Sequence, residues 1–66
     1  MDALHEEVLA RSTVLLVEDE VSLRKSFKKV LELWVKEVIE ADDGEVALQL
    51  YDKHHPDILI TDIKMP

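Results

Sequence analysis

Three short apolar segments alternate with two helical patterns along this chain, and their order restricts the possible folds more than any other feature. Residues 14–17, 35–41 and 58–62 have the length and composition of β-strands. The strand ends fall at Asp19, Ala41 and Asp62, at nearly equal intervals. Regular βα units of this kind predict a parallel α/β sheet with right-handed crossovers. The first strand is apolar on both faces, as a strand covered by helices on each side must be, whereas the mixed faces of 35–41 predict a sheet edge.

The first helical pattern starts at Val21 and has one apolar and one basic face. Apolar residues recur at steps of three or four and form one stripe along the helix, which ends at Trp34: Leu23, Phe27, Val30, Leu31 and Trp34. This stripe is expected to face the core. The opposite face is mainly basic: Arg24, Lys25, Lys28, Lys29 and Glu32. A solvated helix face explains this basic cluster more simply than a partner surface does.

The second helical pattern has a recognisable start and end. The turn sequence Asp42-Asp43-Gly44 precedes it, and Asp43 is expected to cap the helix. Pro56 ends it, because proline has no N–H to donate and restricts the residue before it. Residues 1–12 carry only a weak helical signal, which predicts a frayed extension or a short helix packed on a neighbour.

Composition narrows the class of protein further. Sixty-six residues permit one small domain or a piece of a larger one. The absence of cysteine excludes stabilisation by a disulfide bond or by a metal site with thiolate ligands. The net charge of −7, from 15 acidic and 8 basic residues, disfavours a nucleic-acid surface. The longest apolar run is too short for a membrane span or a signal peptide. We therefore expect a soluble cytoplasmic protein with no direct nucleic-acid or membrane partner.

Carboxylates close the first and third strands, at Glu18-Asp19 and at Asp62. In a parallel sheet these ends lie at one edge, and neighbouring strands are about 4.8 Å apart. Carboxylates this close repel one another unless a cation lies among them, and Mg²⁺ fits a site with few carboxylates, waters and a phosphoryl oxygen. An aspartate beside that cation could attack a phosphoryl donor. The alternative is a pair of helix N-caps, which also favour acidic residues.

The surrounding residues resemble the receiver domain of two-component response regulators. Three stretches carry the resemblance, in the family's order and spacing: Val14-Leu15-Leu16-Val17-Glu18-Asp19-Glu20, Glu40-Ala41-Asp42-Asp43-Gly44-Glu45-Val46-Ala47-Leu48, and Pro56-Asp57-Ile58-Leu59-Ile60-Thr61-Asp62-Ile63-Lys64-Met65-Pro66. The resemblance covers residues 13–66 and leaves 1–12 as an N-terminal extension. It implies a truncated flavodoxin-like α/β fold, β-α-β-α-β, with parallel strand order 2-1-3.

The resemblance also implies a site and a partner. Asp62 would accept a phosphoryl group from the phosphohistidine of a sensor histidine kinase or a histidine phosphotransfer protein. Asp19 would bind Mg²⁺ directly, Glu18 directly or through water, and Asp62 and the backbone carbonyl of Lys64 would complete the protein ligands. Such a domain is a regulatory phosphoacceptor and not an enzyme. The histidines match no functional position of the family and are expected at the surface: His5, His54 and His55.

The chain also departs from the family pattern. A complete receiver continues through a fourth and a fifth strand, which supply a hydroxyl residue and a lysine that contact the phosphoryl group. Both would lie past Pro66, so we expect an incomplete switch. The third strand would then form an open edge, which predicts self-association through that edge or swapping of elements between copies.

Two other functions compete with phosphoryl acceptance. The first is a pseudo-receiver that is never phosphorylated and acts as a protein-interaction module. The second is a phosphatase that uses a strand-end aspartate as its nucleophile. Such phosphatases usually carry a second aspartate two residues later, where this chain has Lys64, and this departure disfavours the phosphatase.

Overall fold

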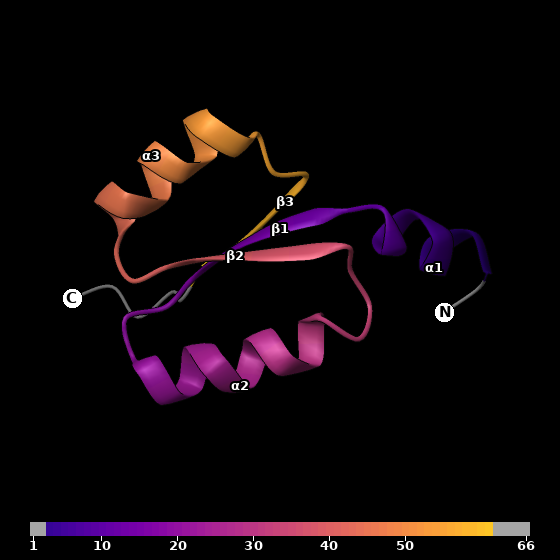
Figure 1. The fold of residues 1–66 in the computed structure, drawn as a ribbon, viewed down its shortest axis with the longest axis horizontal. Coiled ribbons are helices and arrows are strands. Elements are labelled where there is room, and N and C mark those ends of the chain that lie inside the picture. Colours follow the sequence, from indigo (N-terminus) through magenta and orange to yellow (C-terminus); the bar gives the residue numbers. More distant parts are fainter. Residues whose placement is uncertain (1–2, 62–66) are drawn as a thin grey trace.

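The computed structural model describes residues 3–61 and contains three helices and three strands within that range (Figure 1). They follow one another as α1 (Ala3–Ala10), β1 (Thr13–Val17), α2 (Val21–Leu31), β2 (Glu37–Ala41), α3 (Gly44–His54) and β3 (Ile58–Thr61). From β1 onward, strands and helices alternate as the spacing of the apolar segments predicts. None of the helices in the described range is long and apolar enough to cross a membrane.

The three strands form one parallel sheet in the order β2-β1-β3. This order confirms the predicted 2-1-3 arrangement and places β2 at an edge, as its mixed faces indicate. The register aligns Val17 with Ala41 of β2 on one side and with Thr61 of β3 on the other. The carboxyl ends of all three strands therefore lie at the same edge of the sheet.

The core is centred on β1 because helices cover both faces of this strand. Figure 1 shows α3 on one side of the sheet and α2 on the other. Val14, Leu15 and Leu16 are each only 1% exposed. Leu15 belongs to a cluster on the α3 side with Val17, Ala41 and Ala47, and the alternation of a strand directs Val14 and Leu16 to the α2 side.

The ends of α3 follow the local chemistry of the sequence. The Asp43 side chain accepts a hydrogen bond of 2.9 Å from the backbone N–H of Val46, which confirms the predicted N-cap. At the other end, His55 adopts the left-handed conformation with φ 48°, and its N–H donates to the Tyr51 carbonyl. The buried Pro56 follows directly and starts the approach to β3.

The structure corrects the expected core role of the α2 stripe. No residue of α2 is buried, and Phe27 and Val30 are 45% and 56% exposed. The helix ends at Leu31, so that Trp34 lies beyond it and is 49% exposed instead of sitting in the core. The reason is coverage: in the described range α2 packs on β2 and β1 but not on β3, which leaves the outer part of its stripe uncovered.

The boundaries of β2 and of the N-terminal extension also differ from the prediction. The strand begins at Glu37, because a turn after α2 still occupies the two preceding residues. The extension forms α1, an expected helix, but within residues 3–61 it packs on no other element. Arg11 forms an ion pair of 2.6 Å with Glu7, and the Ser12 hydroxyl donates to the Val8 carbonyl. The expected packing of this helix on a neighbour is therefore not seen.

Candidate functional site

The acidic residues after β1 lie at the carboxyl edge of the sheet. Glu18 and Asp19 directly follow Val17, which pairs with Thr61 across the parallel β1–β3 ladder. Thr61 is the residue immediately before Asp62 in the sequence. Four further residues of the predicted site lie outside the described range: Asp62, Lys64 (through its carbonyl), Met65 and Pro66.

Glu18 is held by backbone and side-chain hydrogen bonds. It is only 3% exposed, and its N–H extends the β1–β2 ladder by donating to the Ala41 carbonyl at 3.0 Å. Its Oε2 accepts a hydrogen bond of 3.0 Å from the Glu20 N–H. Its carbonyl oxygen accepts a hydrogen bond of 2.8 Å from the Arg24 guanidinium. Asp19 is exposed, so the pair consists of one buried, oriented carboxylate and one that solvent reaches.

A second charged group, not foreseen from the sequence, lies behind this pair. The Glu40 carboxylate of β2 forms ion pairs with three side chains of α2: Arg24 at 3.2 Å, Lys25 at 3.0 Å and Lys28 at 3.3 Å. The hydrogen bond from Lys25, with those from Lys28 and Arg24, lowers the pKa of Glu40 from 4.5 to about 2, although burial acts in the opposite direction. Part of the basic face of α2 is therefore not simply solvated: the Arg24 side chain is 13% exposed.

The two described carboxylates, Glu18 and Asp19, are suitable ligands for a hard divalent cation. Glu18 and Asp19 provide carboxylate oxygens, which Mg²⁺ prefers over nitrogen or sulfur ligands. Within residues 3–61 there is no group of three or more acidic, histidine or cysteine side chains that could hold a metal ion. The third expected carboxylate, Asp62, lies outside that range. His54 and His55 are exposed at the C-terminal end of α3, as expected for surface histidines.

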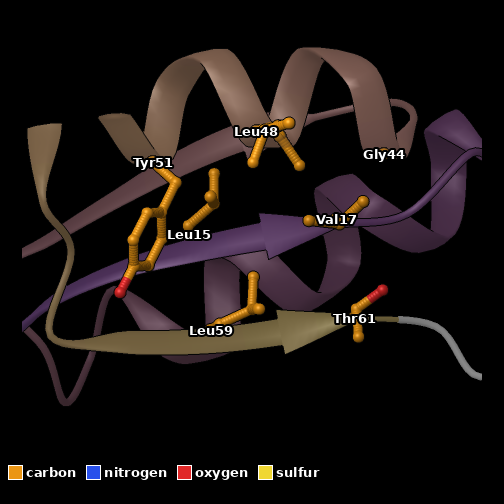
Figure 2. Close-up of a pocket in the computed structure, with 8 residues that line it drawn as sticks. Leu15, Val17, Gly44, Leu48, Tyr51, Leu59 and Thr61 are labelled. Carbon is orange, nitrogen blue, oxygen red and sulfur yellow. The ribbon is translucent and has the colours of Figure 1, made fainter. Parts of the chain in front are cut away.

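An apolar hollow of about 380 Å³ lies between α3 and the β1–β3 ladder. Figure 2 shows its lining, which comes from β1, α3 and β3 and includes Leu15, Val17, Leu48, Tyr51, Leu59 and Thr61. In the described residues α3 packs on β2 and β1 and not on β3. The hollow is therefore an uncovered part of the core face, and the residues of 3–61 that line it include no charged group.

Comparison with known proteins places this arrangement in a family. The family model for the response regulator receiver domain matches residues 14–66. A probable transcriptional regulator, ycf27, from Cyanophora paradoxa is 36% identical over 85% of this chain, and its counterpart from Guillardia theta is 43% identical over 85%. The transcriptional regulatory protein PdtaR of Mycobacterium tuberculosis is 41% identical over 80% of the chain.

These relatives are considerably longer than the chain. The matched region covers 23%, 22% and 26% of the three proteins, so the chain spans about a quarter of their length. No solved structure gives a significant match. The family match covers most of the chain, and the strand order and the acidic end of β1 agree with it. The chain therefore belongs to the receiver domain family of two-component response regulators.

Proposed function

We propose that Asp62 accepts a phosphoryl group from the phosphohistidine of a sensor histidine kinase or a histidine phosphotransfer protein, in the presence of Mg²⁺. One observation carries the proposal. Val17 and Thr61 are paired in adjacent parallel strands, and each directly precedes an acidic residue of the expected site. Membership of the receiver family supports a role for this site as a phosphoacceptor in two-component signalling.

The transfer is an exchange of one bond to phosphorus for another. A carboxylate oxygen of Asp62 forms a P–O bond while the P–N bond of the phosphohistidine breaks. The electron pair of that bond stays on the imidazole nitrogen, which takes up a proton from solvent, and the protein carries an acyl phosphate. Reactions of this type depend mainly on positioning and on neutralising the phosphoryl oxygens. Bound Mg²⁺ supplies that neutralisation.

The protein ligands in this proposal are Glu18, Asp19, Asp62 and the backbone carbonyl of Lys64. The exposure of Asp19 supports direct contact of its carboxylate with the cation. Glu18 is buried and its Oε2 accepts the Glu20 N–H, so its carboxylate is already oriented at this edge, where it would bind the cation directly or through a water molecule. The burial of Glu18 also keeps its carboxylate in one orientation before the cation arrives.

Acetyl phosphate with Mg²⁺ tests this proposal directly. Intact-mass measurement of the 66-residue chain should detect one added phosphoryl group, and peptide mapping should place it on Asp62. Chelation of the metal, or Asp19→Asn, should reduce the modification, and Asp62→Asn should abolish it. An unmodified chain, or a modification that survives in Asp62→Asn, would contradict the proposal and favour a receiver that acts only as an interaction module.

We also propose that the 66-residue chain self-associates through the open edge of β3 or by swapping elements between copies. In the described residues β3 pairs only with β1, and Leu59 and Ile60 are 53% and 37% exposed. An unpaired strand edge with apolar faces is a template for another chain. Sedimentation at micromolar concentration should detect species larger than the 7.6 kDa monomer, and a compact monomer would refute this assembly.

The phosphoryl donor, a histidine kinase or phosphotransfer protein, leads us to propose a cytoplasmic location.

A further inference from the structure

The Arg24 side chain connects three segments that meet behind the acidic pair. It projects from α2, its Nη1 donates to the Glu18 carbonyl oxygen at 2.8 Å, and its Nε donates to Glu40 Oε1 of β2 at 3.2 Å. Arg24 is 13% exposed and Glu40 19% exposed, so water competes little for these bonds. The planar guanidinium makes both bonds at once, with its donors in a fixed geometry.

The carbonyl that Arg24 contacts belongs to the peptide unit between Glu18 and Asp19. A peptide unit is planar, so fixing the Glu18 oxygen also fixes the direction of the Asp19 N–H and the starting point of the Asp19 side chain. Two other polar groups of Glu18 are hydrogen-bonded as well: its N–H donates to the Ala41 carbonyl, and its Oε2 accepts from the Glu20 N–H. Arg24 thus completes the orientation of the segment that carries both carboxylates.

Glu40 in turn fixes Arg24. Its carboxylate lies against α2, where Lys25 and Lys28 also bind it. These cations, chiefly Lys25, lower the pKa of Glu40 to about 2, so that its carboxylate is charged at neutral pH and stays charged in moderate acid. Arg24 is therefore paired with a charged carboxylate at neutral pH, and this pairing holds its guanidinium where it also reaches the Glu18 carbonyl.

We propose that Arg24, anchored by Glu40, is a positioning residue for the Mg²⁺ site: its two hydrogen bonds hold the Glu18-Asp19 peptide in the orientation that binds the cation. This inference rests on the proposed function of the acidic pair. For the loss of Arg24, the positioning role and the charge predict opposite changes in Mg²⁺ affinity. Removing a cationic side chain beside a Mg²⁺ site should tighten metal binding by simple electrostatics. Loss of positioning should weaken it.

Metal affinity of three variants separates the two effects. Arg24→Gln removes the charge and the paired bonds, and Arg24→Lys keeps the charge but cannot make both bonds with one fixed group. We expect both to bind Mg²⁺ about tenfold more weakly in calorimetric titration, as for other groups that orient metal ligands. Lys29→Gln is the matched control, because it removes an exposed cation of the same helix that makes no described contact with Glu40 or Glu18, and its affinity should not fall. Unchanged or tighter binding by folded Arg24→Gln would overturn the inference.

A second measurement needs no metal. Hydrogen exchange of the Asp19 and Glu20 amides in the metal-free chain should accelerate in Arg24→Lys and in Glu40→Gln, while amides of β1 and β3 keep their protection. Exchange unchanged at these two amides would also overturn the inference. If the unaltered chain shows no Mg²⁺ binding that Asp19→Asn removes, the proposed function fails. If it shows such binding and the Arg24 variants leave it unchanged, only the positioning role fails.

Discussion

Replacing Glu40 with glutamine is expected to destabilise the fold at neutral pH and to remove part of its sensitivity to acid. In the folded chain the pKa of Glu40 lies near 2, against an ordinary value of 4.5, because of Lys25 first and then Lys28 and Arg24. The ionised form of Glu40 is therefore more stable in the folded chain than in the unfolded chain. A variant that cannot ionise loses that difference.

The size of the effect follows from the pKa difference and from exposure. A lowering from 4.5 to about 2 corresponds to at most about 3 kcal/mol of stability. The Lys25 side chain is 55% exposed, and solvent weakens ion pairs of this kind. After that screening we expect about 1–2 kcal/mol. Because the folded-state pKa is the lower one, this stabilisation is complete above pH 4.5 and is lost as the pH falls from 4.5 toward about 2.

Urea unfolding at a series of pH values measures this difference. The free energy of unfolding of the unaltered chain minus that of Glu40→Gln should be constant above pH 4.5 and shrink as the pH approaches 2. Glu37→Gln, at an exposed position of the same strand, controls for the loss of any carboxylate and should show little difference. A difference between Glu40→Gln and the unaltered chain that stays constant over this acid range would refute the reasoning.

Four other substitutions test the packing and the helix ends by thermal or urea unfolding. Leu15→Ala, at a residue 1% exposed, should cost about 2–5 kcal/mol, whereas Leu48→Ala, at a residue 66% exposed, should be nearly neutral; equal losses would contradict the assigned core. Asp43→Ala removes the acceptor of the Val46 N–H and should cost about 1 kcal/mol together with some α-helical circular dichroism. His55→Gly should raise stability by about 1 kcal/mol, because glycine adopts φ 48° without strain, and a loss would show that the His55 side chain contributes to the fold.

The strands and their order could be predicted because their signals are local. The apolar run of β1, the acidic residues after it and the turn at Asp43 all lie within a few residues of the structure they specify. The exposure of Trp34 could not be predicted in this way. A stripe of apolar residues shows which side of a helix prefers burial, but only the packed fold shows how much of that side another element covers.

The Arg24–Glu40 contact escaped prediction for a related reason. The two residues are distant in sequence, and their charges match many partners equally well in an acidic chain. Their meeting depends on α2 lying across β2, which the pattern of α2 alone does not specify. The position of Glu18 and Asp19 at the carboxyl edge of the sheet was predictable, because strand direction determines it. The support behind them was not, because it depends on tertiary packing.

The junction of α1 with the sheet has a mechanical consequence. The Ser12 carbonyl accepts a hydrogen bond of 2.9 Å from the Lys36 N–H. The Thr13 N–H donates to the Asp57 carboxylate, and the Thr13 carbonyl accepts from the Asp57 N–H. A force applied along α1 therefore enters at the middle strand, with a neighbour on each side. Displacing β1 along its own axis requires the hydrogen bonds to β2 and to β3 to break together. A force on α1 is therefore borne by both neighbouring strands before it reaches the carboxyl edge of the sheet.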